Sequence, residues 1–506
     1  MRRVPLSAVV LLAIITWCMP TYGESPQVVM RVALSVTLPF EFLLEQDALV
    51  FPLLAAEPVD KAEEASNGHE VDDNEQYISL GSSRELFRIR KGELPREVVL
   101  CHPSGKTVSF LGGLRIVPVD CTSPAFRIKD ALYPGELQIV FGVSKSGCYE
   151  ATAINLVDIE AYVEGVLAGE VYPSWAPEAL KAQAVASRTY ALRRKADNES
   201  RNYDVDDTVL SQVYVGENRV DAFRIAVLET RGQVLVYEDV PIRAHYFSSG
   251  GGTTEGDEEV WLGGRDEPYL TAREDFDWKS PHYRWKEPLV MKSQDLLGKL
   301  GLRPDFPAWI EPSIRSDSKI LAYRFRAGDQ VINLTREQIR HRIGLQSPRF
   351  DITITDGEGE GKLVSDQAEL SPSAILIFDG VGKGHGVGLS QWGAQGMASI
   401  LDSNGVPLYT YVDILKHYYP GTELVNNCNI PKEYMEPACE DQAELVCEGE
   451  GFTESVHEDH VEPVSGDHVE TMHEDHAEPS YDDCAGLVHE EEYTEPGCID
   501  AWDLYW

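Results

Sequence analysis

One glutamate stands where a carboxyl group could do acid–base chemistry. Glu170 follows Gly169 at the end of a predicted helix, directly before Val171 and close to Trp175 in the sequence. In such a corner between two helices a carboxyl group is partly desolvated, which raises its pKa. A carboxyl group that is protonated near neutral pH can act as the general acid on a glycosidic oxygen. The plainer alternative is that Glu170 is one of many solvated acids near a helix end.

A glycine-rich run far downstream carries side chains suited to holding a sugar. Between Gly380 and Gly396 the glycines allow tight turns and a close approach of the backbone to a ligand. The run supplies hydrogen-bonding groups and one flat aromatic face at His385, Ser390, Gln391 and Trp392. We expect the three polar residues to face the same cleft as the glutamate, because a lone carboxyl group cannot keep a polar sugar in register. The alternative is a tight turn on another face of the domain.

Two other chemistries are disfavoured in this run. GKGHGVG lacks the GxxxxGK[ST] spacing of a phosphate-binding loop, which argues against a nucleotide site. A nucleophile pair of Ser390 and His385 is conceivable, but no GxSxG elbow is present. Sugar binding is therefore the preferred interpretation.

Several long segments follow one another along the chain in a distinctive order. They are GEVYPSWAPEALKAQAVASRTYAL from Gly169, GKGHGVGLSQWGAQGMA from Gly382 and ILKHYYPGTEL from Ile414, with NLVDIEAYVEGV upstream from Asn155. Together they resemble the SpoIID/LytB family (stage II sporulation protein D and amidase enhancer). The likeness covers roughly residues 130–424, which makes a chance match very improbable.

The resemblance implies a lytic transglycosylase that cuts the MurNAc–GlcNAc bond of peptidoglycan and leaves a 1,6-anhydro sugar. It implies that Glu170 is the essential glutamate, and that the preferred glycan has lost its stem peptides to an amidase partner. Arg188 and Tyr190, from the same segment, join the side chains of the glycine-rich run as substrate-binding candidates. The alternative from another class is a non-catalytic glycan-binding protein that stimulates an N-acetylmuramoyl-L-alanine amidase.

The chain departs from the family at one place. Some members bind zinc through a histidine and cysteines around the SSGG loop, whereas this sequence has Phe247 and Gly250 at those positions. His245 lies nearby, but a lone histidine is more often structural than a ligand. We therefore expect no metal and no cofactor.

The elements that must position these residues follow from hydrophobic periodicity. Helical spacing begins after Asp158 and ends at Gly169, and a second helix runs from Pro177 to about Lys195. Further helices are predicted at 335–343 and 411–418, and short β-branched runs predict strands elsewhere. The fold class is therefore α+β: a strand-rich body with a grouped helix pair that borders a substrate cleft.

Charge and targeting signals divide the chain. The predicted parts are a signal peptide at 1–23, a β-rich region at 24–129 with an acidic loop at 57–76, a SpoIID/LytB-like catalytic domain at 130–430, and a disordered acidic tail at 431–506. The net charge is −40, and the tail holds 24 acidic residues and one basic residue. Such a field repels polyanions, so we expect no nucleic-acid partner. The short apolar run after Arg3 predicts export to the periplasm or cell envelope, and no later stretch could span a membrane.

Overall fold

The computed structural model describes most of the chain between residues 28 and 426. The described ranges are 28–53, 77–80, 86–120, 124–143, 147–263, 266–317, 319–356 and 361–426. The predicted signal peptide, acidic loop and acidic tail lie outside these residues. Apart from those of Val143–Glu150, the described residues belong to one compact unit. Helices and many strands confirm the α+β class.

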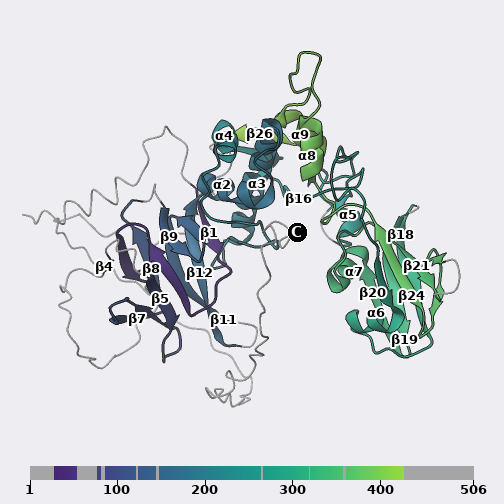
Figure 1. Cartoon of the computed structure of the whole chain (residues 1–506), viewed down its shortest axis with the longest axis horizontal. Helices are drawn as coiled ribbons and strands as arrows, with labels where there is room; N and C mark the ends of the chain where they lie inside the picture. The colour runs from purple at the N-terminus through teal and green to yellow at the C-terminus, as the bar shows by residue number, and fades with distance from the viewer. Residues whose placement is uncertain are drawn as a thin grey trace, which may run out of the picture. The chain divides into compact units, whose positions relative to one another are not determined.

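Two sheets make up the N-terminal region (Figure 1, purple and blue). The first has the strand order β13 (Val205–Asp206), β1 (Val29–Ala33), β12 (Tyr149–Asp158), β11 (Glu136–Val143), β8 (Gly113–Pro118), β3 (Ala48–Pro52), β4 (Ile78–Leu80). The second has the order β10 (Ala131–Pro134), β9 (Pro124–Ile128), β2 (Phe40–Leu44), β5 (Leu86–Lys91), β6 (Glu97–Cys101), β7 (Thr107–Leu111). The expected domain boundary after residue 129 falls inside both sheets, because β10 pairs with β9 and β11 pairs with β8.

A group of helices follows β12. Its members are α2 (Ile159–Glu170), α3 (Pro177–Asp197), α4 (Asp221–Glu229), α8 (Gln391–Ala398) and α9 (Tyr411–Tyr418). The carboxylate of Asp158 accepts a hydrogen bond from the Glu160 N–H, which confirms the predicted N-cap of α2. Pro177 opens α3, where a proline costs no helical hydrogen bond. Helix α3 is buried along most of its length and packs against α2, α4, α8 and α9.

Short strands join segments that are far apart in sequence. Strand β14 (Gln233–Tyr237) lies between β15 (Val240–Pro241) and β26 (Glu423–Asn426). Strand β16 (Tyr246–Phe247) runs parallel to β25 (Leu389–Ser390). This last pairing brings the loop after Phe247 beside the glycine-rich run.

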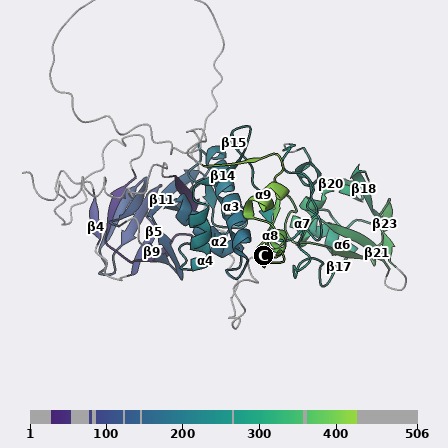
Figure 2. The ribbon, with the colours of Figure 1, turned by 90° about the horizontal axis from the view of Figure 1, so that it is seen from above.

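A second β region, with its own hydrophobic core, lies within the predicted catalytic domain (Figure 1, teal and green). Its two sheets have the orders β17 (Leu289–Lys292), β24 (Ile375–Gly380), β21 (Phe350–Thr355), β22 (Lys362–Leu363), and β20 (Gln330–Thr335), β19 (Lys319–Ala327), β18 (Ala308–Ser316), β23 (Ala368–Leu370). Helices α6 (Ser293–Lys299) and α7 (Arg336–Ile343) pack against these sheets (Figures 1 and 2).

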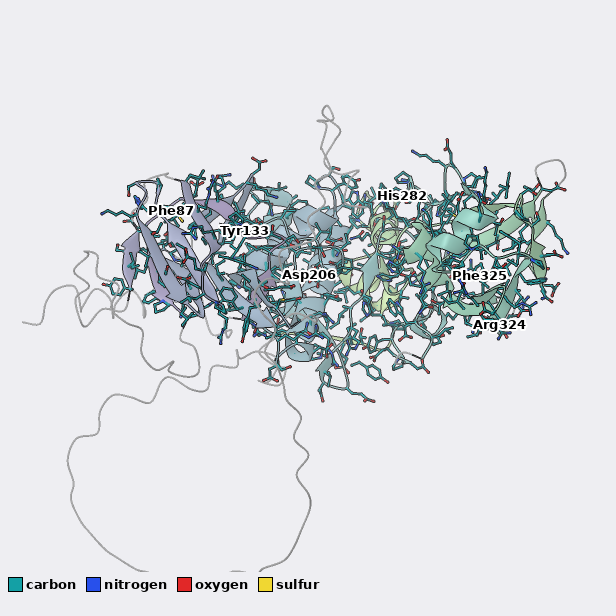
Figure 3. The ribbon with its side chains drawn as sticks, turned by 90° about the horizontal axis from the view of Figure 1, so that it is seen from below. Phe87, Tyr133, Asp206, His282, Arg324 and Phe325 are labelled. Carbon is teal, nitrogen blue, oxygen red and sulfur yellow. The ribbon has the colours of Figure 1, made fainter. Side chains whose placement is uncertain are left out.

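Local sequence explains both ends of α7. Thr335 and Gln338 form a reciprocal capping box at its start, and Gly344 ends it in the left-handed region at φ 77°. The predicted helix at 335–343 is thereby confirmed. On the neighbouring strand β19, Arg324 is exposed and Phe325 is buried, as the alternation of a strand with one wet face requires (Figure 3). Among the described residues, no helix is both long and apolar enough to cross a membrane.

Candidate functional site

Glu170 is the last residue of α2, and its side chain is only 7% exposed. Oε1 accepts a hydrogen bond from the Val213 N–H at 2.9 Å, and Oε2 accepts one from Nε2 of Gln391 at 3.1 Å. Burial raises the pKa of Glu170 from 4.5 to about 7, although these donors and the Tyr246 hydroxyl favour the charged form. The predicted desolvation at the helix corner is confirmed. At neutral pH this carboxyl group exists in both protonation states.

Two glycines of α2 let the segment that carries Val213 pack closely against the helix. A Cβ on Gly169 would lie 2.4 Å from the carbonyl oxygen of Val213, and one on Gly165 would lie 2.4 Å from that of Gly216. Any larger residue would push this segment away and remove the Val213 N–H from the carboxyl group. Sequence reasoning missed Val213, because a backbone donor leaves no mark on its own residue type.

Gln391 reaches Glu170 because it begins a helix that the sequence analysis did not predict. Helix α8 starts directly after Ser390, whose hydroxyl accepts a hydrogen bond from the Gly393 N–H at 3.1 Å. The Gln391 side chain is 3% exposed, so its amide is held in one place by burial as well as by the carboxylate. The glycine content of the run disguised α8, since glycine lowers helix propensity.

A buried polar network stands behind the carboxyl group. Nε2 of Gln212 donates to the Tyr246 hydroxyl at 2.9 Å, and the Tyr162 hydroxyl donates to Oε1 of Gln212 at 3.1 Å. The Tyr246 hydroxyl in turn hydrogen-bonds Glu170. Tyr190 contacts Tyr246 edge to face, with ring centroids 6.3 Å apart. The candidate Tyr190 therefore adjoins the network and does not hydrogen-bond the carboxylate directly.

Three aromatic rings lie next to Glu170 and Gln391 in sequence and against one another in space. The Trp175 and Trp392 ring centroids are 5.1 Å apart, and Tyr172 lies 5.7 Å from Trp175 and 6.3 Å from Trp392. Tyr172 is 43% exposed and Trp392 is partly exposed. We call these three residues the aromatic wall. Its exposed rings offer the flat apolar face that the sequence analysis expected of Trp392 alone.

Arg188, one of the expected substrate-binding residues, lies in the core. Its side chain is fully buried, and its guanidinium pairs with the carboxylate of Glu160, with Nη2 and Oε2 2.6 Å apart. Nη1 also donates to the Gln233 carbonyl at 3.1 Å. Arg188 thus connects α2, α3 and β14 in the core.

His385 and Ser390 also have other tasks than the one expected. Nε2 of His385 lies 3.0 Å from the Tyr246 carbonyl, and Nδ1 accepts a hydrogen bond from the Val387 N–H at 3.1 Å. Burial lowers the pKa of His385 to about 3, so the ring is neutral. Ser390 is fully buried as the cap of α8. Of the three polar candidates, Gln391 is the one whose side chain donates a hydrogen bond to Glu170.

A second buried carboxyl group holds the loop after Phe247. Oδ1 of Asp275 accepts a hydrogen bond from the Tyr418 hydroxyl at 2.8 Å, and Oδ2 accepts one from the Gly250 N–H at 3.0 Å. The side chain of Ser390 also hydrogen-bonds Asp275. Burial and, to a smaller extent, the nearby charge of Asp277 together raise the pKa of Asp275 to about 7. Sequence analysis missed both aspartates, because nothing in DFDWK marks them among 84 acidic residues.

The residues at the family's zinc positions do not fit a metal. Phe247 has no ligand atom, and its ring packs against His385 with centroids 5.5 Å apart. A Cβ on Gly250 would meet Oδ2 of Asp275 at 2.5 Å, so a larger ligand residue has no room there. Burial lowers the pKa of His245 to about 4, and its ring packs against Trp261.

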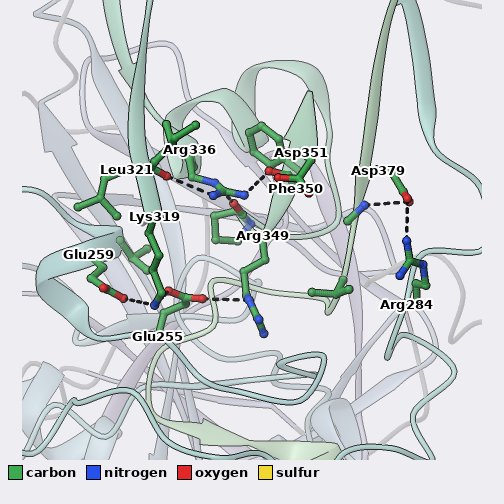
Figure 4. A pocket seen from close by; sticks show the side chains of 15 residues that line it. Glu255, Glu259, Arg284, Lys319, Leu321, Arg336, Arg349, Phe350, Asp351 and Asp379 are labelled. Atoms are coloured by element: carbon green, nitrogen blue, oxygen red, sulfur yellow. Dashed lines mark hydrogen bonds and ion pairs between the residues drawn. The ribbon is translucent and has the colours of Figure 1, made fainter. Parts of the chain in front are cut away.

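A charged cavity of about 300 Å³ borders the same loop (Figure 4). Nζ of Lys319 lies 3.0 Å from the Glu255 carboxylate, and Nε of Arg349 lies 2.9 Å from it. Arg349 also donates to the carbonyls of Gly250 and Thr253. Lys319 and Arg349 thus connect this loop to the second β region.

The chain is similar in sequence to several known proteins. Residues 149–237 match the family model described as Stage II sporulation protein. Stage II sporulation protein D of Bacillus subtilis is 31% identical over 305 residues, which cover 56% of this chain and 79% of that protein. The amidase enhancer of Bacillus subtilis is 31% identical over 307 residues, covering 52% of this chain and 40% of that protein. An uncharacterised protein of Brachyspira hyodysenteriae is 31% identical over 328 residues, covering 62% and 77%. The chain belongs to the SpoIID/LytB family.

Proposed function

We propose that this protein is a peptidoglycan lytic transglycosylase, which cleaves the MurNAc–GlcNAc bond and leaves a 1,6-anhydroMurNAc end. The observation that carries the proposal is the buried Glu170 carboxyl group, whose pKa is raised to about 7. A general acid works best when its pKa lies near the working pH. Family membership and the aromatic wall beside this group support the same reaction.

The reaction needs one group that first gives and then takes a proton. The Glu170 carboxyl group protonates the glycosidic oxygen while the bond from that oxygen to C1 of MurNAc breaks. The resulting carboxylate accepts the proton of the C6 hydroxyl as O6 forms its bond to C1. The carboxyl group is thus restored, and neither water nor a second carboxylate takes part. Val213, Gln391 and Tyr246 stabilise the carboxylate between the two transfers.

The surroundings of Glu170 match a stem-peptide-free glycan as substrate. The exposed rings of Tyr172 and Trp392 offer stacking surface to pyranose rings. The side-chain amide of Gln391 has two N–H donors, so it can donate to a sugar hydroxyl as well as to a carboxylate. A cell-wall amidase first removes the stem peptides of the substrate, so that the aromatic wall contacts only sugar rings.

Location and partners follow from the proposed reaction. The substrate lies outside the cytoplasmic membrane, so the protein acts in the periplasm or cell envelope after export. Its partners are glycan strands and a cell-wall amidase. The second candidate is a non-catalytic protein that stimulates an N-acetylmuramoyl-L-alanine amidase, and the similarity to the amidase enhancer favours it.

Mass analysis of cleavage products separates the two candidates. Purified full-length protein is incubated with glycan strands whose stem peptides have been removed enzymatically. The proposal predicts fragments that end in 1,6-anhydroMurNAc, each one water lighter than a hydrolysed fragment. Fragments with free reducing ends would make the protein a hydrolase. Intact glycan, together with faster amidase turnover on whole peptidoglycan, would favour the second candidate.

A further inference from the structure

The sheet formed by β20, β19, β18 and β23 has one face that lies outside the second hydrophobic core. The opposite face is part of the second hydrophobic core, through Ile310, Tyr323, Phe325, Leu334 and Leu370. The outward side chains alternate with these along each strand and line a groove of about 560 Å³. All the residues that line this groove lie outside the helices.

The groove residues stand in two rows across the strands. In the first row Trp309 is paired with Arg326, and Arg326 with Val331. In the second row Glu311 is paired with Arg324, and Arg324 with Asn333. Arg324 is one of the exposed side chains labelled in Figure 3. The groove side chains thus form two regular rows, an arrangement that suits an extended polymer.

Each row is held in place by its own contacts. The guanidinium carbon of Arg326 lies 4.2 Å from the centroid of the Trp309 ring, a close cation–π contact. Nη1 of Arg324 lies 3.0 Å from the Glu311 carboxylate, and its Nε donates to Asn333 at 3.0 Å. A face whose side chains are already ordered loses less entropy when it binds a ligand.

The chemistry of the groove selects its occupant. In a chain of net charge −40, the groove is lined by two arginines and one glutamate, with the amides of Asn333 and Gln367 beside them. An indole gives stacking surface, amides bond to N-acetyl groups and hydroxyls, and arginine recognises carboxylate. Glycan that has lost its stem peptides carries N-acetyl groups along the strand and free lactyl carboxylates.

We propose that this outward sheet face is a second glycan-binding surface, which holds a stem-peptide-free strand while Glu170 cuts elsewhere along it. The substrate class rests on the proposed function. A polymer held at two sites stays bound after each cut, because release at one site leaves a high local concentration at the other. The surface therefore acts on retention of long strands and not on the chemical step.

Binding and cleavage are measured separately to test this. In a Glu170→Gln background, which keeps the strand intact, Trp309→Ala is expected to weaken binding of labelled stem-peptide-free strands by roughly tenfold, the scale of an interface anchor. The control is Trp278→Ala, which removes an indole that is 51% exposed outside the groove. Circular dichroism checks that each variant is folded, and Trp309→Phe should restore part of the binding.

Each outcome is decisive for the surface, whether or not the chain cleaves. Equal binding by folded Trp309→Ala and Trp278→Ala would overturn the proposal. So would a dimer of the unliganded protein that Trp309→Ala dissolves, since a second copy would then be the occupant. Equal affinity for neutral N-acetylglucosamine oligomers would overturn the role given to the arginines. In an otherwise wild-type chain, Trp309→Ala should slow cleavage of long strands and leave cleavage of short ones unchanged.

Discussion

Glu170 and Asp275 are two buried carboxyl groups whose side-chain partners, Gln391 and Ser390, are neighbours in the sequence. Burial raises the pKa of each to about 7. Gln391 donates to Glu170, whereas Ser390 hydrogen-bonds Asp275. The same desolvation therefore acts on both, yet the surroundings assign them different tasks.

Access separates the two. Beside Asp275, a Cβ on Gly393 would lie 1.9 Å from Oδ1, so the protein itself fills the space around this carboxyl group. Beside Glu170 stands Tyr172, which is 43% exposed and belongs to the aromatic wall. A raised pKa alone thus does not mark a reactive group; it needs a surface on which a substrate can lie.

The largest expected effect contrasts the two carboxyl groups in cleavage. Glu170→Gln should lower the rate of glycan cleavage by about 10²–10⁴-fold, the usual scale for loss of a general acid. Asp275→Asn keeps the size of the side chain, and the cleavage rate of the folded variant should fall far less than this. Single-turnover cleavage assays measure both rates. Similar losses in two folded variants would break the contrast.

The free energy of unfolding should depend on pH because Glu170 is buried. Its pKa is about 7 when folded against 4.5 when unfolded, so the folded state binds the proton more tightly. The stability gained from this proton is complete below about pH 4.5 and is lost as the pH rises to 7. Glu170→Gln removes this dependence. The free energy of unfolding of the variant should therefore rise, relative to that of the wild type, by up to about 3 kcal/mol between pH 4.5 and pH 7.

Urea unfolding at several pH values measures this difference. The Asp275→Asn variant gives the comparison, because the raised pKa of Asp275 predicts a trend of the same sign. A constant difference between Glu170→Gln and wild type from pH 4.5 to pH 8 would show that Glu170 has an ordinary pKa.

A smaller effect, on glycan binding, is expected from substitution of Gln391. Gln391→Ala should weaken glycan binding by about 1–3 kcal/mol, because it leaves buried polar groups without a partner. Loss of this donor should also raise the pKa of Glu170, which moves the pH optimum of cleavage upward. Gln294→Ala on α6 is the control, since it removes an exposed glutamine of the second β region. Unchanged glycan binding would place Gln391 outside the substrate contacts.

The smallest effect is expected from removal of residues 429–506. This acidic segment lacks periodic apolar residues and repels itself. The truncated protein should keep its melting temperature and its rate of glycan cleavage. A circular dichroism melt without a cooperative transition would contradict this.

Sequence predicted those parts of the site that depend on local pattern. Asp158 and Pro177 marked the starts of α2 and α3, and the helix corner correctly implied a desolvated Glu170. Helix α8 was missed, because its cap and packing outweigh the low propensity of its glycines.

The remaining partners are non-local. Val213 and Asp275 meet the site through tertiary contacts across 43 residues to Glu170 and 143 residues to Tyr418. Arg188 was a substrate-binding candidate from the family-like segment, but the sequence did not show that its guanidinium would pair with Glu160 in the core. Single-sequence periodicity carries no information on such pairings.

The pH dependence of cleavage tests most directly that the protonated Glu170 carboxyl group performs the reaction. The value of kcat/KM is measured for the wild type on stem-peptide-free glycan between about pH 5 and pH 9. Because the acid must hold its proton, kcat/KM should fall tenfold per pH unit above about 7, the pKa that burial gives Glu170. A value that stays level up to pH 9, or that already falls from pH 5 with an ordinary glutamate pKa, would contradict the account.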